Sequence, residues 1–222
     1  SADRDLKEAL SLAPNNVNSL MNFGTLLWKM GQKDSARQTF NHVLELDKNN
    51  RQALSALGYL ARDAGDNKLA ESYFQRAIAA HPKDYVSYLA LGDLYTAERN
   101  FGSAEKNYQS AYQLMPTNPL IISGAANAAL ESHNLNLAQQ WLQRANAKMN
   151  TNAQVQRERE RYLFFKGDYA ESAKLGESVL TKLPSDREGI VYLAYDLYYL
   201  GRFDEALALV NKYEPILKND KD

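Results

Sequence analysis

The sequence predicts an all-α protein in which a pair of helices recurs every 34 residues. Four prolines lie at multiples of 34 residues from one another: Pro14, Pro82, Pro116 and Pro184. A small residue recurs in the same frame at Ala36, Ala70, Ala104, Ala138, Ser172 and Ala206. A second small-residue series comprises Gly24, Gly58, Gly92, Ala126 and Ala194, interrupted by Glu160. A third series comprises Phe40, Phe74, Tyr108, Leu142, Gly176 and Val210. Because all of these series share one period, they indicate a repeat architecture.

Residues 51–84 show how one unit forms two helices. The first helix presents one apolar face at three- and four-residue spacing, made of Leu54, Leu57, Gly58 and Ala61. Gly65 and Asp66 interrupt that pattern, and a second apolar face follows at Ala70, Phe74, Ala77 and Ile78. Pro82 ends the unit, because a proline cannot continue the helix.

The small residues are expected where the two helices of a unit approach each other. Gly58 and Ala70 carry little or no side chain, so the two backbones can come close together there. The ring of Phe74 then fills the wider part of the same seam.

These residues resemble the signature of the tetratricopeptide repeat (TPR) family. Residues 85–118 carry it most fully, as Tyr88, Leu91, Gly92, Tyr95, Ala104, Tyr108 and Pro116. The resemblance covers essentially the whole chain. It implies a right-handed α-solenoid of stacked helix–turn–helix units with about thirteen helices.

The 34-residue frame also predicts the organisation of the chain, as a single solenoid over residues 1–222. Residues 1–16 match the second helix of a preceding unit. The full units are 17–50, 51–84, 85–118, 119–152, 153–186 and 187–220. Since the first unit is incomplete, we expect the chain to be a fragment of a longer protein. Pro215 is expected to end or bend the last helix.

Composition and charge exclude several classes of function. The chain has 26 Lys and Arg against 27 Asp and Glu, so it lacks the positive field that non-specific nucleic-acid or anionic-membrane binding needs. No apolar run approaches the ~20 residues of a membrane helix. The absence of cysteine excludes thiol nucleophiles and cysteine zinc sites. We therefore expect no nucleic-acid partner and no membrane insertion by this chain.

The sequence contains no recognisable catalytic, cofactor or metal site. Its three histidines, His42, His81 and His133, belong to three different repeats. No zinc-protease, nucleophile-elbow, phosphate-loop or calcium-loop motif occurs. The prediction is that the protein is not an enzyme and holds no cofactor or metal.

The first helix of each unit presents a face opposite its packing face, formed by unit positions 2, 5, 9 and 12. The family resemblance implies that this face lines a concave groove where partners bind. The candidate partner-binding residues are Trp28, Tyr59, Arg62, Asp93, Asn127, Arg157, Arg161, Tyr195 and Tyr198. The family's clamp for chaperone carboxyl-terminal tails is not matched, because Met21, Thr25, Ala56, Val86 and Ala90 stand at the clamp positions.

Arginines and tyrosines converge in the carboxy-terminal half of this face, which predicts the main anchor for an acidic or aromatic peptide at Arg157, Arg161, Tyr195 and Tyr198. Two alternatives remain open at this point. The tyrosines could instead fill the seam between the last two units, and the arginines could balance Glu158, Glu160 and Glu188. The site would then move to Trp28, Tyr59 and Arg62, or off the groove altogether.

The unit 153–186 departs most from the pattern. Glu160 occupies the close-approach position, where we expect it to push the two helices apart or to reach solvent. The unit is then either a degenerate repeat or a hinge or docking surface. Taken together, the sequence predicts a non-enzymatic scaffold that binds a peptide or partner protein of unspecified identity in the groove. The alternative is the repeat arm of a larger enzyme or of a bacterial secretion or polysaccharide-export assembly.

Overall fold

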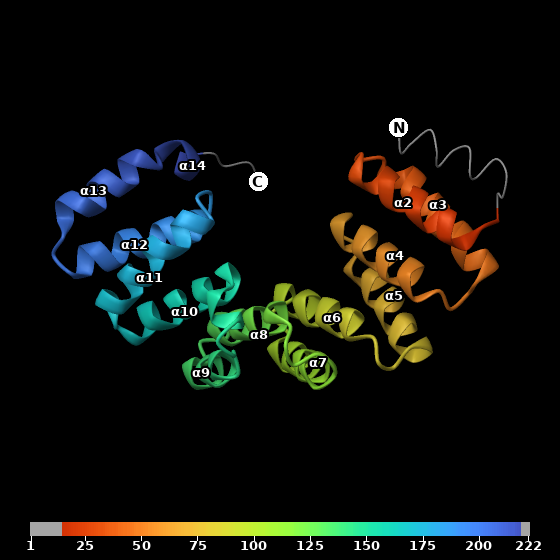
Figure 1. The fold of residues 1–222 in the computed structure, drawn as a ribbon, viewed down its shortest axis with the longest axis horizontal. Helices are drawn as coiled ribbons and strands as arrows, with labels where there is room; N and C mark the ends of the chain where they lie inside the picture. The colour runs from red at the N-terminus through yellow and green to blue at the C-terminus, as the bar shows by residue number, and fades with distance from the viewer. Residues whose placement is uncertain (1–14, 219–222) are drawn as a thin grey trace. The chain divides into compact units, whose positions relative to one another are not determined.

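The computed structural model describes residues 15–218, which form thirteen α helices, α2–α14, and no strands (Figure 1). The helix predicted over residues 1–16 lies almost wholly outside these residues. The chain divides into two compact units at Leu114 and Met115. The all-α repeat fold is therefore confirmed over the part of the chain that the structure describes.

Within residues 15–114, the amino-terminal unit has six helices joined by short turns. They are α2 (Val17–Lys29), α3 (Lys33–Leu46), α4 (Arg51–Asp63), α5 (Asn67–Ala80), α6 (Tyr85–Ala97) and α7 (Phe101–Leu114). Asparagine or aspartate side chains cap the amino-terminal ends of several of these helices. Asn16 accepts from the Ser19 amide at 2.9 Å, and Asn50 accepts from the Ala53 amide at 3.0 Å. These bonds satisfy amides that have no partner within the helix.

The carboxy-terminal unit, described over residues 115–218, has the remaining seven helices. They are α8 (Pro119–Glu131), α9 (Leu135–Gln143), α10 (Ala153–Lys166), α11 (Tyr169–Lys182), α12 (Arg187–Tyr199), α13 (Phe203–Lys212) and α14 (Glu214–Lys218). Helix α9 is short. The Asn146 side chain accepts from the amide of the buried Met149 at 2.9 Å. A 3₁₀ turn, Met149–Thr151, starts at that methionine. Pro215 lies in α14, after α13 has ended at Lys212, as expected.

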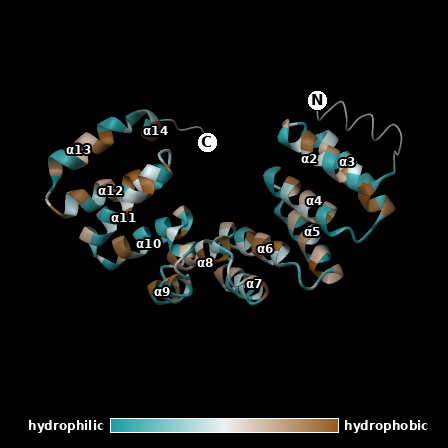
Figure 2. Ribbon diagram, viewed as in Figure 1, coloured by the Kyte–Doolittle hydropathy of each residue, from teal (hydrophilic) through white to brown (hydrophobic). Residues whose placement is uncertain are grey.

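The predicted seam between paired helices is confirmed in the first three units. A Cβ placed on Gly24, Gly58 or Gly92 would lie 2.5, 2.6 or 2.7 Å from a ring carbon of Phe40, Phe74 or Tyr108, respectively. Those three rings are at most 1% exposed. In Figure 2 the helices carry hydrophobic and hydrophilic residues together, as expected of helices that bury one face.

The six turns between paired helices also keep the 34-residue frame. Each places one residue in the left-handed backbone region: Gly31, Gly65, Arg99, His133, Gly167 and Gly201, with φ between 57° and 88°. Glycine adopts this conformation without a steric penalty, which explains why it is the commonest residue there. His133 is accordingly a turn residue.

Candidate partner-binding surfaces

The fifth repeat, residues 153–186, reverses the pairing of a glycine on the first helix with an aromatic ring on the second that the first three repeats show. Glu160 on α10 occupies the glycine position, and Gly176 on α11 stands at the aromatic position. Glu160 is 0% exposed, and a Cβ on Gly176 would collide with its Oε1 atom. The expectation that Glu160 reaches solvent or separates the helices is therefore wrong, because Gly176 leaves room for the glutamate side chain.

Glu160 shares this buried seam with Asp196 of α12, which is also 0% exposed. None of the four carboxylate oxygens forms a hydrogen bond with any residue that the structure describes. Burial, together with the nearby Asp196 and Asp186 carboxylates, raises the pKa of Glu160 to about 8. Burial likewise raises the pKa of Asp196 to about 6, against a smaller lowering effect of the Ser172 hydroxyl. Both shifts follow from the cost of burying a charge that is not compensated.

Arg161 is 3% exposed and lies among polar partners. Its Nη1 donates to Asn127 Oδ1 at 2.6 Å and to Glu158 Oε2 at 2.9 Å, and its Nη2 donates to Glu131 Oε1 at 2.8 Å. Asn127 and Arg161 are thus brought together. Because its charge is already neutralised inside the protein, Arg161 offers no free cation to a partner.

Arg157 is also engaged, although its side chain is 27% exposed. Its Nε lies 2.9 Å from Asp186 Oδ2, and its Nη2 donates to Glu188. For Arg157 and Arg161 these contacts agree with the alternative in which the arginines balance Glu158 and Glu188. Glu160, the third glutamate of that alternative, forms no ion pair among the described residues.

The tyrosines of α12 divide between the seam and the surface. Tyr192 packs in the seam, with its ring centroid 5.0 Å from that of Phe164 and 5.7 Å from the Arg161 guanidinium carbon. Tyr195 and Tyr198 are 52% and 58% exposed. These two predicted residues therefore remain accessible to a partner.

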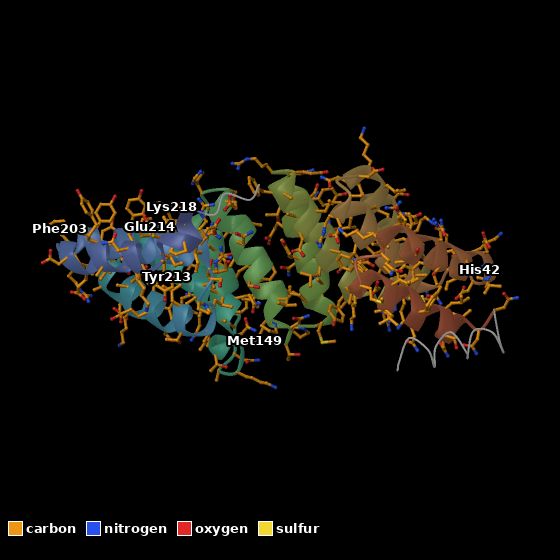
Figure 3. The ribbon with its side chains drawn as sticks, turned by 90° about the horizontal axis from the view of Figure 1, so that it is seen from above. His42, Met149, Phe203, Tyr213, Glu214 and Lys218 are labelled. Atoms are coloured by element: carbon orange, nitrogen blue, oxygen red, sulfur yellow. The ribbon has the colours of Figure 1, made fainter. Side chains whose placement is uncertain are left out.

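An apolar pocket of about 460 Å³ lies between α12 and α13 and is also lined by Leu217 of α14. Its walls include a set of exposed side chains that we call the α12–α13 surface: Val191, Tyr195, Tyr198, Phe203, Leu207 and Val210. Of this set, Tyr195 and Tyr198 were predicted from the sequence as binding residues, whereas the three on α13 were not; Phe203 begins that helix (Figure 3). The available signal was their apolar character at four- and three-residue spacing along one helix.

The predicted residues of the amino-terminal unit form a second cluster. The rings of Trp28 and Tyr59 are 6.4 Å apart, and the Arg62 guanidinium carbon lies 5.1 Å from the Tyr59 ring centre. Burial, with the nearby Asp93 carboxylate, raises the pKa of Tyr59 to about 12. Asp93 accepts from the Tyr108 hydroxyl at 2.8 Å. The four predicted residues thus lie close together, but they are only partly exposed.

Within residues 15–218 no group of three or more acidic or histidine side chains is placed to hold a metal ion. No helix in that range is both long enough and apolar enough to cross a membrane.

Two tetratricopeptide repeat family models match the chain, one at residues 21–85 and 55–119 and the other at 95–159. The chain is 30% identical over 92 residues to the CTR9 homolog of Arabidopsis thaliana, covering 41% of this chain and 8% of that protein. It is also 30% identical over 91 residues to cellulose synthase operon protein C of Komagataeibacter xylinus, covering 38% and 7%. The chain thus spans under a tenth of the length of either relative.

Among solved structures, PilF of Pseudomonas aeruginosa superposes with a TM-score of 0.79 at 14% sequence identity. The match covers 92% of this chain and 93% of PilF. At this identity the likeness concerns the fold alone.

Proposed function

Because the chain belongs to the tetratricopeptide repeat family, whose repeats generally mediate protein–protein interaction, we propose that it is a non-enzymatic scaffold for a partner protein. The observation that carries this proposal is the α12–α13 surface, where six neighbouring apolar side chains are 37–61% exposed. Contiguous exposed apolar surface on a protein marks an interaction site. Tyrosine also contributes large contact area at interfaces.

The chain itself indicates the shape of the partner. Counting back 34 residues from the α12–α13 surface leads to Arg157, Arg161, Phe164, Tyr169, Ala173 and Gly176. Several of these residues contact α12: Arg157 pairs with Glu188, Phe164 packs on Tyr192, and Tyr169 stacks on Tyr199 with ring centroids 4.6 Å apart. The equivalent position one repeat earlier is therefore occupied by a helix.

We therefore propose that the partner contributes an amphipathic helix to the α12–α13 surface. In the amino-terminal unit, the corresponding face of α2 and α3 is covered by Ala53, Leu57 and Leu60 of α4. The α12–α13 surface is apolar as well, so a helix with an aliphatic stripe at that spacing is its expected ligand. Of the four residues of the predicted anchor, Tyr195 and Tyr198 contact the partner. Arg157 and Arg161 instead hold α12 in place through their contacts with Glu188 and Tyr192.

The test is a binding titration with a designed helical peptide of about 16 residues, long enough for partial helicity. Its leucines repeat the spacing of Ala53, Leu57 and Leu60 on a background of Glu, Lys and Ala. Leu207→Glu should weaken binding at least about tenfold. Leu69→Glu is the matched control, because Leu69 is a 43% exposed leucine on α5. Equal binding by the two variants would show that the peptide binds elsewhere.

The cluster of Trp28, Tyr59, Arg62 and Asp93 is proposed as a secondary contact in the groove. Trp28 and Arg62 keep part of their surface accessible, whereas Tyr59 and Asp93 are held by internal contacts. If Arg62→Ala lowers the affinity for an identified partner while the fold is retained, this cluster belongs to the binding surface.

A second candidate is a repeat arm within a bacterial polysaccharide-export assembly. It is favoured by the similarity to cellulose synthase operon protein C, of which the chain spans 7%. An immunoblot of the source cells with an antibody raised against this chain distinguishes the scaffold from the repeat arm. A band far larger than 25 kDa that co-purifies with a polysaccharide synthase would support the arm. A band near 25 kDa would support the scaffold alone.

A further inference from the structure

Glu160 and Asp196 form a buried acidic pair that no partner-binding role explains. Both side chains are 0% exposed, and no hydrogen bond within residues 15–218 reaches their carboxylate oxygens. A buried carboxylate without a partner is much less costly when it carries a proton. The state of this pair therefore depends on proton concentration.

The surroundings of the pair do not compensate two negative charges. From α11, Gly176 presents no side chain, and the Ser172 hydroxyl donates to the backbone carbonyl oxygen of Glu160 at 3.1 Å. The same hydroxyl favours the charged form of Asp196, but by less than burial opposes it. Asp186, which precedes α12, adds negative charge. On α10 itself, Glu158 is paired with Arg161 at 2.9 Å.

Arg157 is the cation on α10 whose field favours the charged form of Glu160. It is already paired with Asp186 and Glu188. Charging both Glu160 and Asp196 therefore places two carboxylates together in a seam from which water is excluded.

The same seam supports the aromatic residues of α12. Phe164 lies one helical turn after Glu160 on α10, and its ring packs against Tyr192 and Tyr195 with centroid distances of 5.0 and 6.3 Å. Tyr195 directly precedes Asp196 in the sequence and belongs to the α12–α13 surface. A change in the packing of α10 against α12 therefore alters how Tyr195 is presented.

We propose that Glu160 and Asp196 make the seam between α10, α11 and α12 responsive to pH, tightly packed when both carry protons and looser when both are charged. Its effect on partner binding rests on the function proposed above, whereas its effect on the seam does not. Since the pKa of Asp196 is raised to about 6 and that of Glu160 to about 8, the change falls between about pH 6 and pH 8.

The direct test is a carbon-13 NMR titration of the carboxyl groups in the whole chain. Glu160→Gln and Asp196→Asn identify the two resonances by removing them. We expect midpoints near 8 and 6, respectively. Midpoints close to the ordinary values of 4.5 and 3.8 would overturn the proposal.

Hydrogen exchange tests whether the titration changes packing. After correction for intrinsic exchange, α10 and α12 of the wild-type chain should lose protection between about pH 5.5 and 8.5, relative to α4 and α5. The variant carrying both Glu160→Gln and Asp196→Asn should not show this loss. Glu177→Gln, at a 58% exposed glutamate, is the control and should behave as wild type. Loss of protection that persists in the doubly substituted chain would refute the proposal.

Peptide binding separates this inference from the proposed function. If both hold, affinity falls between pH 5.5 and 8.5 in the wild type and stays constant in the doubly substituted chain. If the designed peptide fails to bind at either pH while the two carboxyl midpoints are raised, only the proposed function fails. If the peptide binds with the same affinity at both pH values and the midpoints are ordinary, only the pH response fails.

Discussion

Asn127 and Arg161 stand at the same position in successive repeats, 34 residues apart, and a 2.6 Å hydrogen bond joins their side chains. The same guanidinium also contacts Glu131 at 2.8 Å and Glu158 at 2.9 Å. A polar contact thus links α8 to α10 inside the carboxy-terminal unit. Arg161 acts in the packing between repeats.

Arg161→Ala should lower the free energy of unfolding by about 3–5 kcal/mol, because it removes the nearer cation of the buried Glu158 and leaves only Arg157, 3.9 Å away. Urea denaturation followed by circular dichroism measures this change. Arg37→Ala, at an exposed arginine on α3, should cost under about 1 kcal/mol. If the two variants have the same stability, the buried network contributes little.

Gly92→Leu should destabilise the amino-terminal unit by about 1–3 kcal/mol or more, because its Cβ would lie 2.7 Å from the Tyr108 ring. Ala104→Leu, in the same seam, should have a similar effect since Ala104 is 0% exposed. Gly102→Leu is the matched control, because a Cβ on Gly102 has no neighbour within 4 Å. Its denaturation midpoint should be unchanged or slightly raised, as leucine favours helix over glycine.

The reversed pair predicts that Glu160 and Gly176 are energetically coupled. Gly176→Phe alone should destabilise the chain, because the ring would overlap the Glu160 side chain. Combining it with Glu160→Gly should restore part of the loss by recreating the arrangement of Gly58 and Phe74. A double-mutant cycle measures this coupling from the free energies of unfolding of the wild type, the two single variants and the double variant. Purely additive free energies would indicate that the two positions do not share one space.

Stability should fall as the solution becomes more alkaline from about pH 4.5 to pH 8. The pKa of Glu160 is raised from 4.5 to about 8, so the folded chain binds an extra proton over that window. The contribution is full below pH 4.5 and is lost as pH rises through the folded pKa. The limiting slope is about 1.4 kcal/mol per pH unit for one such proton. Asp196 adds to it between 3.8 and about 6.

Chemical denaturation at a series of pH values measures that slope. Glu160→Gln should flatten it and should be more stable than wild type near pH 8. A wild-type stability that rises throughout this range would contradict the assignment.

The sequence by itself determined the helices, the turns between paired helices and the seam within the first three repeats. These contacts join residues that are close together along the chain, such as Gly58 and Phe74. The contacting residues therefore recur at a constant separation, which can be read directly from the sequence. The left-handed turn residues follow the same frame because one backbone geometry reverses the chain in every unit. Because this turn geometry recurs in six repeats, it appears in the sequence as the 34-residue period.

The tertiary structure alone decided which polar groups are buried and which aromatic rings are free. Tyr192 and Tyr195 are three residues apart on α12, yet one packs in the seam and the other is 52% exposed. Glu160 is accommodated by Gly176 of the next helix and lies near Asp196 of the one after it. The burial of a carboxylate depends on the side chains that three helices bring together around it. The spacing of residues along one helix therefore cannot predict it.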